Sequence, residues 1–328
     1  MANAASARTI RLLAATAVVA FVSGCAGTTS AGVSSTQSPA QASASPSGTS
    51  TTSSELPAVQ QWQPASNDVQ PDVKLRAARL IEAIGTWSRG QQGVATARLR
   101  VVAIGDNPQL VSATNPLLTP ATAAVTKVDF AQYGGILADS ASVLLVTEQW
   151  LADKDGVITH TGTTFDVRLS AASPSWTITA VNPAVVRPAA TTLTAQARTA
   201  LANPRLTLPF ATQADIRSGT ISTAVLRTLN GLSKTHAITI SILASGHPLD
   251  VFGTTRPSDH PIGRAVDISA IDGRPVIDPA GYRTVASVMR EGVALGAYQA
   301  GGPVQLSPSS VYFSDNTHHD HIHLGFRG

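Results

Sequence analysis

Two short segments rich in histidine and aspartate constrain the fold of this chain more than any other feature. Residues 258–268 read SDHPIGRAVDI, and residues 318–323 read HHDHIH. Seven of the eight histidines lie between His236 and His323, a clustering that is typical of a metal site. We therefore expect the fold to bring these two segments, which are distant in the chain, together around one ion.

Alternation along a β-strand explains how the side chains can converge. Successive residues of a strand point to opposite faces, so His321 and His323 share one side. His260, Asp267 and His323 then form a two-histidine, one-carboxylate set, which catalytic zinc centres use when water takes the fourth position. We predict Zn²⁺ at these three residues and assign proton transfer to His321.

The same residues resemble the zinc D,D-peptidase family, the D-alanyl-D-alanine carboxypeptidases and endopeptidases related to the hedgehog-type fold. The resemblance covers about residues 210–328 and rests on S-x-H-x-x-G-x-A-x-D at residues 258–267 and H-x-H at residues 321–323. It implies that His260, Asp267 and His323 bind zinc and that His321 is catalytic. The implied substrate is an amide bond in the peptide stem of peptidoglycan.

One departure from the family concerns recognition of the substrate. Better-known members carry Ser-Gly-Tyr-Arg ahead of the first zinc ligand, and the arginine holds a substrate carboxylate, whereas residues 245–248 here read SGHP. Arg256 or Arg264 could supply the missing cation, because a guanidinium binds a carboxylate through two hydrogen bonds. We take Arg256 and Ser258 as candidate substrate-binding residues.

The remaining histidines of this region receive weaker assignments. His318 is a further candidate for substrate binding, since it could support an oxyanion or orient His321. A solvent-facing His318 is the alternative. For His236 and His247 we expect structural roles.

The amino terminus has the features of a lipoprotein signal peptide. Arg8 and Arg11 precede the apolar residues 12–22, and the segment ends in Val-Ser-Gly-Cys25, which resembles the bacterial lipobox. Cys25 is the only cysteine, so no internal disulfide can form. We predict that residues 1–24 are removed, that Cys25 is lipidated, and that the protein is anchored to the outer face of the cell membrane.

The next segment, residues 25–68, is composed mainly of Ser, Thr, Ala, Gln, Gly and Pro. Such a composition buries too little apolar surface to offset the entropy of ordering, so we predict a disordered tether. Its root-mean-square span is on the order of 35 Å.

Beyond the tether, hydrophobic periodicity predicts an α+β protein with two domains. Residues 69–182 combine a helix opening near Asp72 with later strands, among them a hairpin formed by alternating residues around Phe165 and Trp176. This pattern weakly resembles the nuclear-transport-factor-2-like (NTF2-like) fold. A connector with a short helix, residues 183–209, leads to the domain at residues 210–328, for which we predict two helices and an antiparallel sheet beneath the metal site.

The composition of the chain limits the classes of partner that the protein is expected to bind. Charged residues make up 13% of the chain, the formal net charge is +3, and basic residues do not cluster with aromatic ones, which argues against nucleic acid. We expect the protein to bind a cell-wall peptide and to be attached to the membrane through its N-terminal lipid. The alternative to a peptidase is a non-catalytic zinc-binding lipoprotein that binds or scaffolds wall components.

Overall fold

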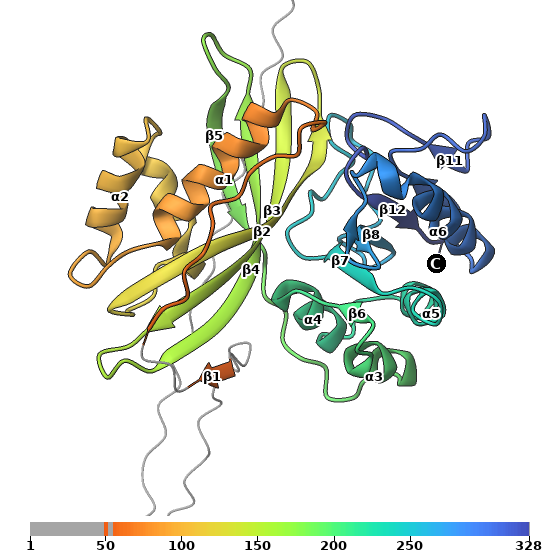
Figure 1. The fold of residues 1–328 in the computed structure, drawn as a ribbon, viewed down its shortest axis with the longest axis horizontal. Coiled ribbons are helices and arrows are strands. Elements are labelled where there is room, and N and C mark those ends of the chain that lie inside the picture. Colours follow the sequence, from red (N-terminus) through yellow and green to blue (C-terminus); the bar gives the residue numbers. More distant parts are fainter. Residues whose placement is uncertain (1–48, 52–54, 328) are drawn as a thin grey trace, which may run out of the picture. The chain divides into compact units, whose positions relative to one another are not determined.

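The computed structural model describes residues 49–51 and 55–327, which form two β-sheets with packed helices (Figure 1). The fold class is α+β, as the sequence predicts. The predicted signal peptide, Cys25 and most of the predicted tether lie outside the described residues. Across those residues, no helix combines the length and apolar character needed to cross a membrane.

The first sheet is antiparallel and follows the order β1-β4-β3-β2, with β5 also paired to β4. Its strands are β1 (Thr49–Thr51), β2 (Ala123–Ile136), β3 (Ser140–Ala152), β4 (Ile158–Ser170) and β5 (Thr177–Pro183). The predicted hairpin around Phe165 and Trp176 is the β4–β5 pair. Register shifts interrupt β2 between Val128 and Phe130 and again between Tyr133 and Gly135, which is how β-bulges bend a strand.

Helix α1 (Pro71–Gly85) packs against this sheet and confirms the predicted amphipathic helix. Its apolar residues recur at helical spacing, and the fully buried ones include Val73, Ala77, Leu80, Ile81 and Ile84. Pro71 is suited to the first position of this helix because an N–H group at that position would have no acceptor within the helix. Three further helical segments follow: α2 (Val94–Ala103) and the 3₁₀ helices η1 (Pro108–Ala113) and η2 (Asn115–Leu117).

The second sheet has seven strands in the order β11-β10-β12-β8-β7-β6, with β9 paired to β8. Its strands are β6 (Leu206–Thr207), β7 (Ile238–Ile242), β8 (Ala265–Ile271), β9 (Arg274–Pro275), β10 (Gln299–Gly301), β11 (Tyr312–Phe313) and β12 (Ile322–Gly325). The sequence predicts an antiparallel sheet beneath the metal site, and the pairs β10–β12, β12–β8, β8–β7 and β8–β9 are antiparallel. The prediction is wrong at the edges of the sheet, where β6 pairs with β7 and β11 with β10 in parallel. A crossover through two helices returns the chain from β6 to β7 in the same direction, which is the connection that parallel pairs require.

We call residues 55–182 the first half of the described chain and residues 183–327 the second half. The helices of the second half enclose its apolar core. They are α3 (Ala195–Ala202), α4 (Phe210–Arg217), α5 (Thr223–Leu232), the 3₁₀ helix η3 (Pro279–Gly281) and α6 (Tyr282–Ala294). The predicted connector helix and the two predicted domain helices correspond to α3, α5 and α6, while α4 is an additional helix. Buried faces of α5 and α6 pack with β7, β8 and β12 in one hydrophobic cluster.

The two sheets also contact each other directly. Leu144 and Val146 of β3 form a buried cluster with Ile242 of β7. At the end of β2, a Cβ on Gly135 would lie 2.1 Å from the Cβ of Phe252, so only glycine permits this approach. These contacts bring the end of β2 beside the loop that leads into β8.

Candidate metal and catalytic site

Antiparallel pairing of β8 and β12 places two of the predicted metal ligands opposite each other. His323 of β12 is the register partner of Asp267 of β8, and both are buried. His260 lies in the loop before β8, where Gly263 adopts a φ of 70° and its N–H donates to the His260 carbonyl at 2.8 Å. A Cβ on Gly263 would lie 2.2 Å from the Thr220 carbonyl oxygen, so this turn requires the glycine of the motif.

The donor atoms of the three predicted ligands converge on one point. His260 Nε2 lies 3.1 Å from His323 Nδ1 and 3.1 Å from Asp267 Oδ1, and His323 Nδ1 lies 3.0 Å from the same oxygen. Ligand atoms of a tetrahedral zinc site with bonds of about 2.0–2.1 Å are separated by roughly 3.3 Å. The observed spacing is therefore close to that of a zinc centre, and a cation fits the nitrogen and oxygen donors that these residues present.

A neighbouring carbonyl group determines which ring nitrogen His260 offers to a metal ion. His260 Nδ1 lies 2.5 Å from the Leu243 carbonyl oxygen, an acceptor, so this nitrogen carries the proton and Nε2 keeps its lone pair. Such an acceptor beside the other ring nitrogen is typical of metal-binding histidines. In His323 it is Nδ1 that faces the other two ligand atoms, while Nε2 lies 3.3 Å from Nε2 of Gln299.

Electrostatics favour the metal-binding protonation states. Burial lowers the pKa of His323 to about 4, although Asp267 acts in the opposite direction. Burial alone would raise the pKa of Asp267, but His260 and His321 outweigh it and hold that pKa well below its usual range. A neutral imidazole and an ionised carboxylate are the forms that bind a metal ion.

His321, the predicted catalytic residue, is buried beside these donors. Its Nε2 lies 3.8 Å from Asp267 Oδ1, and its Nδ1 lies 2.6 Å from Asp320 Oδ1. Burial opposes protonation of His321, but the charges of Asp267 and Asp320 outweigh burial and raise its pKa. A histidine oriented through Nδ1 by a carboxylate presents Nε2 for proton transfer.

A second group of metal-type side chains already contains a cation. Asp68, His319 and Asp320 lie close enough to share an ion. The Nζ atom of Lys74, however, contacts both Asp68 and Asp320, and His319 Nε2 lies 2.9 Å from Asp68. The ammonium of Lys74 therefore takes the place that a metal ion would need here.

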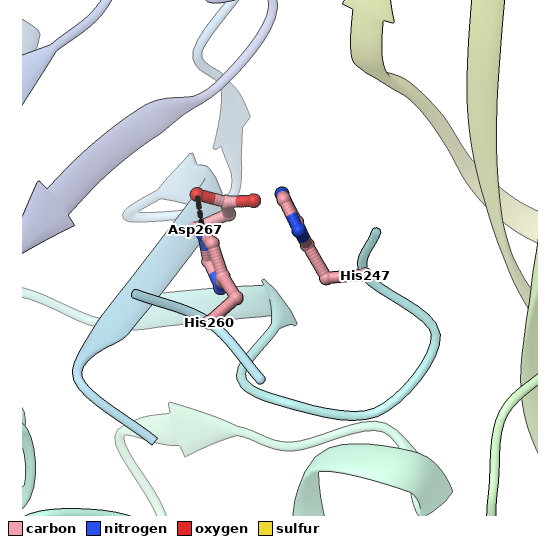
Figure 2. A group of neighbouring side chains, drawn as sticks. All are labelled: His247, His260 and Asp267. Carbon is pink, nitrogen blue, oxygen red and sulfur yellow. Dashed lines mark ion pairs between the residues drawn. The ribbon is translucent and has the colours of Figure 1, made fainter. Parts of the chain in front are cut away.

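The structure adds His247 to the residues that could hold a metal. Figure 2 shows its ring face to face with that of His260, beside the Asp267 carboxylate, and the ring centroids are 4.2 Å apart. His247 Nδ1 donates to the Pro248 carbonyl, so Nε2 is the free nitrogen. The sequence signal for this residue is its position in the segment SGHP, ahead of the first predicted metal ligand.

A cavity of about 410 Å³ opens over the donors. Residues 133–137 of the first half form one wall, and His260, Asp267, His321 and His323 line the cavity from the second half. Both parts of the described chain therefore contribute walls to this cavity.

The three predicted substrate-binding residues also line this cavity. Arg256 is exposed, and within the described residues its guanidinium has no ion-pair partner. Ser258 Oγ accepts a hydrogen bond from the His260 amide at 3.3 Å, while His318 Nδ1 lies 2.8 Å from Asp315 Oδ1. Arg264, the alternative cation, does not line the cavity.

Comparison of the chain with protein-family models, with curated proteins and with solved structures gives no match.

Proposed function

We propose that this protein is a membrane-anchored, zinc-dependent peptidase that hydrolyses amide bonds in peptidoglycan stem peptides. The observation that carries the proposal is the convergence of His260, Asp267 and His323 donor atoms within 3.1 Å, with His321 beside them in a cavity. The resemblance of residues 210–328 to zinc D,D-peptidases supports this assignment. The NTF2-like assignment of residues 69–182 belongs to the same proposal.

Each residue has a defined task in this proposal. His260, Asp267 and His323 would hold the ion, and the chemistry that zinc supplies in such a site is polarisation of a carbonyl and activation of water near neutral pH. His321, whose pKa is raised, donates a proton to the amine that leaves when the amide bond breaks. Asp320 keeps the imidazole of His321 in the required tautomer and orientation.

Arg256 is the residue we assign to a substrate carboxylate. It lines the cavity, whereas Arg264 does not, and its guanidinium is exposed without an ion pair in the described part of the chain. A peptide stem ends in a free carboxylate, and a guanidinium binds such a group through two parallel hydrogen bonds. This replaces the arginine that the family carries two residues after Ser-Gly.

A second candidate function is a non-catalytic, zinc-containing lipoprotein that binds or scaffolds the cell wall. The position of His247 favours it, because structural zinc sites are closed by four protein ligands, whereas catalytic sites keep one position for water. The two functions differ in whether wall peptides are cleaved.

Digestion of purified peptidoglycan separates these two functions. The zinc-loaded protein is expected to release D-alanine or shortened stem peptides, and a chelator is expected to abolish the release until zinc is restored. Mass spectrometry of the products identifies the bond that is cut. If the zinc-loaded protein binds the wall without changing its mass spectrum, the scaffold function replaces the peptidase.

The proposed anchor is tested by the substitution Cys25→Ala. A lipidated amino-terminal cysteine carries two or three acyl chains, enough for stable anchoring, whereas the variant would have none. We expect most of the variant to partition into the aqueous phase in a detergent phase-separation assay, while the wild type enters the detergent phase. Full retention of Cys25→Ala in the detergent phase would contradict lipidation at this residue.

A further inference from the structure

The three ligands of the proposed metal site lie in the second half of the protein, but one of them is held by a side chain from the first sheet. We propose that Gln132 of β2 is a positioning residue for Asp267, so that the elements from α1 to β5 form the outer part of the metal site. The inference rests on the proposed metal site and extends it to a part of the chain that supplies no proposed ligand.

The two oxygens of Asp267 have separate partners. Gln132 Nε2 donates to Oδ2 at 2.7 Å, whereas Oδ1 faces His260 Nε2 and His323 Nδ1. The amide therefore holds the carboxylate in a rotation that directs Oδ1 to the metal position. Side-chain hydrogen bonds of this kind orient the ligands of many metal sites.

The orientation of the Gln132 amide is itself determined by a third residue. Ser241 of β7 is fully buried, and its hydroxyl donates to Gln132 Oε1, so Nε2 must face Asp267. Gln132 is only 3% exposed, so water does not compete for these bonds. Removing the amide would leave Oδ2 of a buried carboxylate without this donor.

A second contact follows the same pattern at His321. Lys74 of α1 is fully buried and contacts Asp320, whose other oxygen lies 2.6 Å from His321 Nδ1. Thus both a metal ligand and the proposed catalytic residue are held through side chains of the first half. This agreement between two separate contacts favours a positioning role over an incidental interface.

The test substitutes Gln132 with methionine, which keeps an unbranched side chain of similar length but donates no hydrogen bond. Loss of an outer partner typically weakens metal affinity about 10–100-fold, and we expect this loss of zinc affinity in Gln132→Met. Zinc affinity is measured by competition with a chromophoric chelator. The visible spectrum of the cobalt(II)-loaded protein is expected to change as well, because the carboxylate turns relative to the ion.

The matched control is Gln149→Met. Gln149 lies on β3 of the same sheet, is 2% exposed, and donates to the carbonyl oxygens of Gly85 and Leu117 at 2.9 and 3.1 Å. It does not line the cavity over the metal site. We therefore expect it to lower the melting temperature of the zinc-free protein but to leave zinc affinity and the cobalt spectrum unchanged.

The outcomes separate this inference from the proposed function. A wild type that binds no zinc overturns both. Equal zinc affinity in wild type and Gln132→Met, or an equal loss in Gln149→Met, overturns only the positioning role. If Gln132→Met does not fold, Gln132→Asn keeps a buried amide that is too short to reach Asp267, and the same affinity measurement decides.

Discussion

Replacing His321 with alanine is expected to lower the rate of stem-peptide hydrolysis about 10²–10⁴-fold, the usual contribution of general acid–base catalysis. His321 is not assigned to the ion, so zinc content should be unchanged. The loss should fall on kcat with little change in KM, because the proton is transferred in the transition state. Zinc content, melting temperature and peptide cleavage are measured on the same preparations.

A matched histidine provides the control for His321→Ala. His236 pairs with Asp272 through Nδ1 at 2.8 Å and does not line the cavity. His236→Ala should therefore cleave peptides at the wild-type rate. Equal rates in wild type and His321→Ala would remove His321 from the mechanism.

Substituting a proposed metal ligand is expected to abolish zinc binding. His260→Ala, Asp267→Ala and His323→Ala each remove one of three donors, so zinc affinity should fall by more than the roughly 10–100-fold typical of an outer partner. Metal analysis after dialysis against a weak chelator should find one zinc per wild-type chain and almost none in the variants. Hydrolysis should be lost with the metal.

An exposed carboxylate serves as the control for this experiment. Asp155 pairs with Lys154 on the surface, and its side chain is 64% exposed. Asp155→Ala should keep full zinc occupancy. Equal occupancy in Asp155→Ala, Asp267→Ala and wild type would show that the ion, if present, is bound elsewhere.

Elements with strong local periodicity could be predicted from the sequence. Helix α1 has a continuous apolar face that is buried, and its spacing alone identifies it. Helix α2 has no such continuous apolar face, since Leu99 and Val102 are 69% and 56% exposed, so residue spacing does not identify this helix. The sequence does not reveal strand β2 either, because its two bulges shift the alternation of residues that is typical of a strand.

The candidate site could be predicted in part for a similar reason. His260, Asp267, His321 and His323 lie within two short segments whose spacing carries information about their geometry. Gln132 and Lys74 are 135 and 246 residues from Asp267 and Asp320, and no local pattern connects residues so far apart. Their contacts depend on how the two sheets pack, which is a property of the folded chain.

The buried ion pairs of Lys74 limit how this protein can be divided. A fragment that begins in the connector, residues 183–209, would lack Lys74, so Asp320 would lose the ammonium that faces it and keep only its contact with His321. The fragment would also lack Leu144 and Val146, so the side chain of Ile242, which is buried against them, would be exposed to water. The carboxyl-terminal half is therefore not a portable module: recombination or truncation at this junction would separate it from part of its own interior.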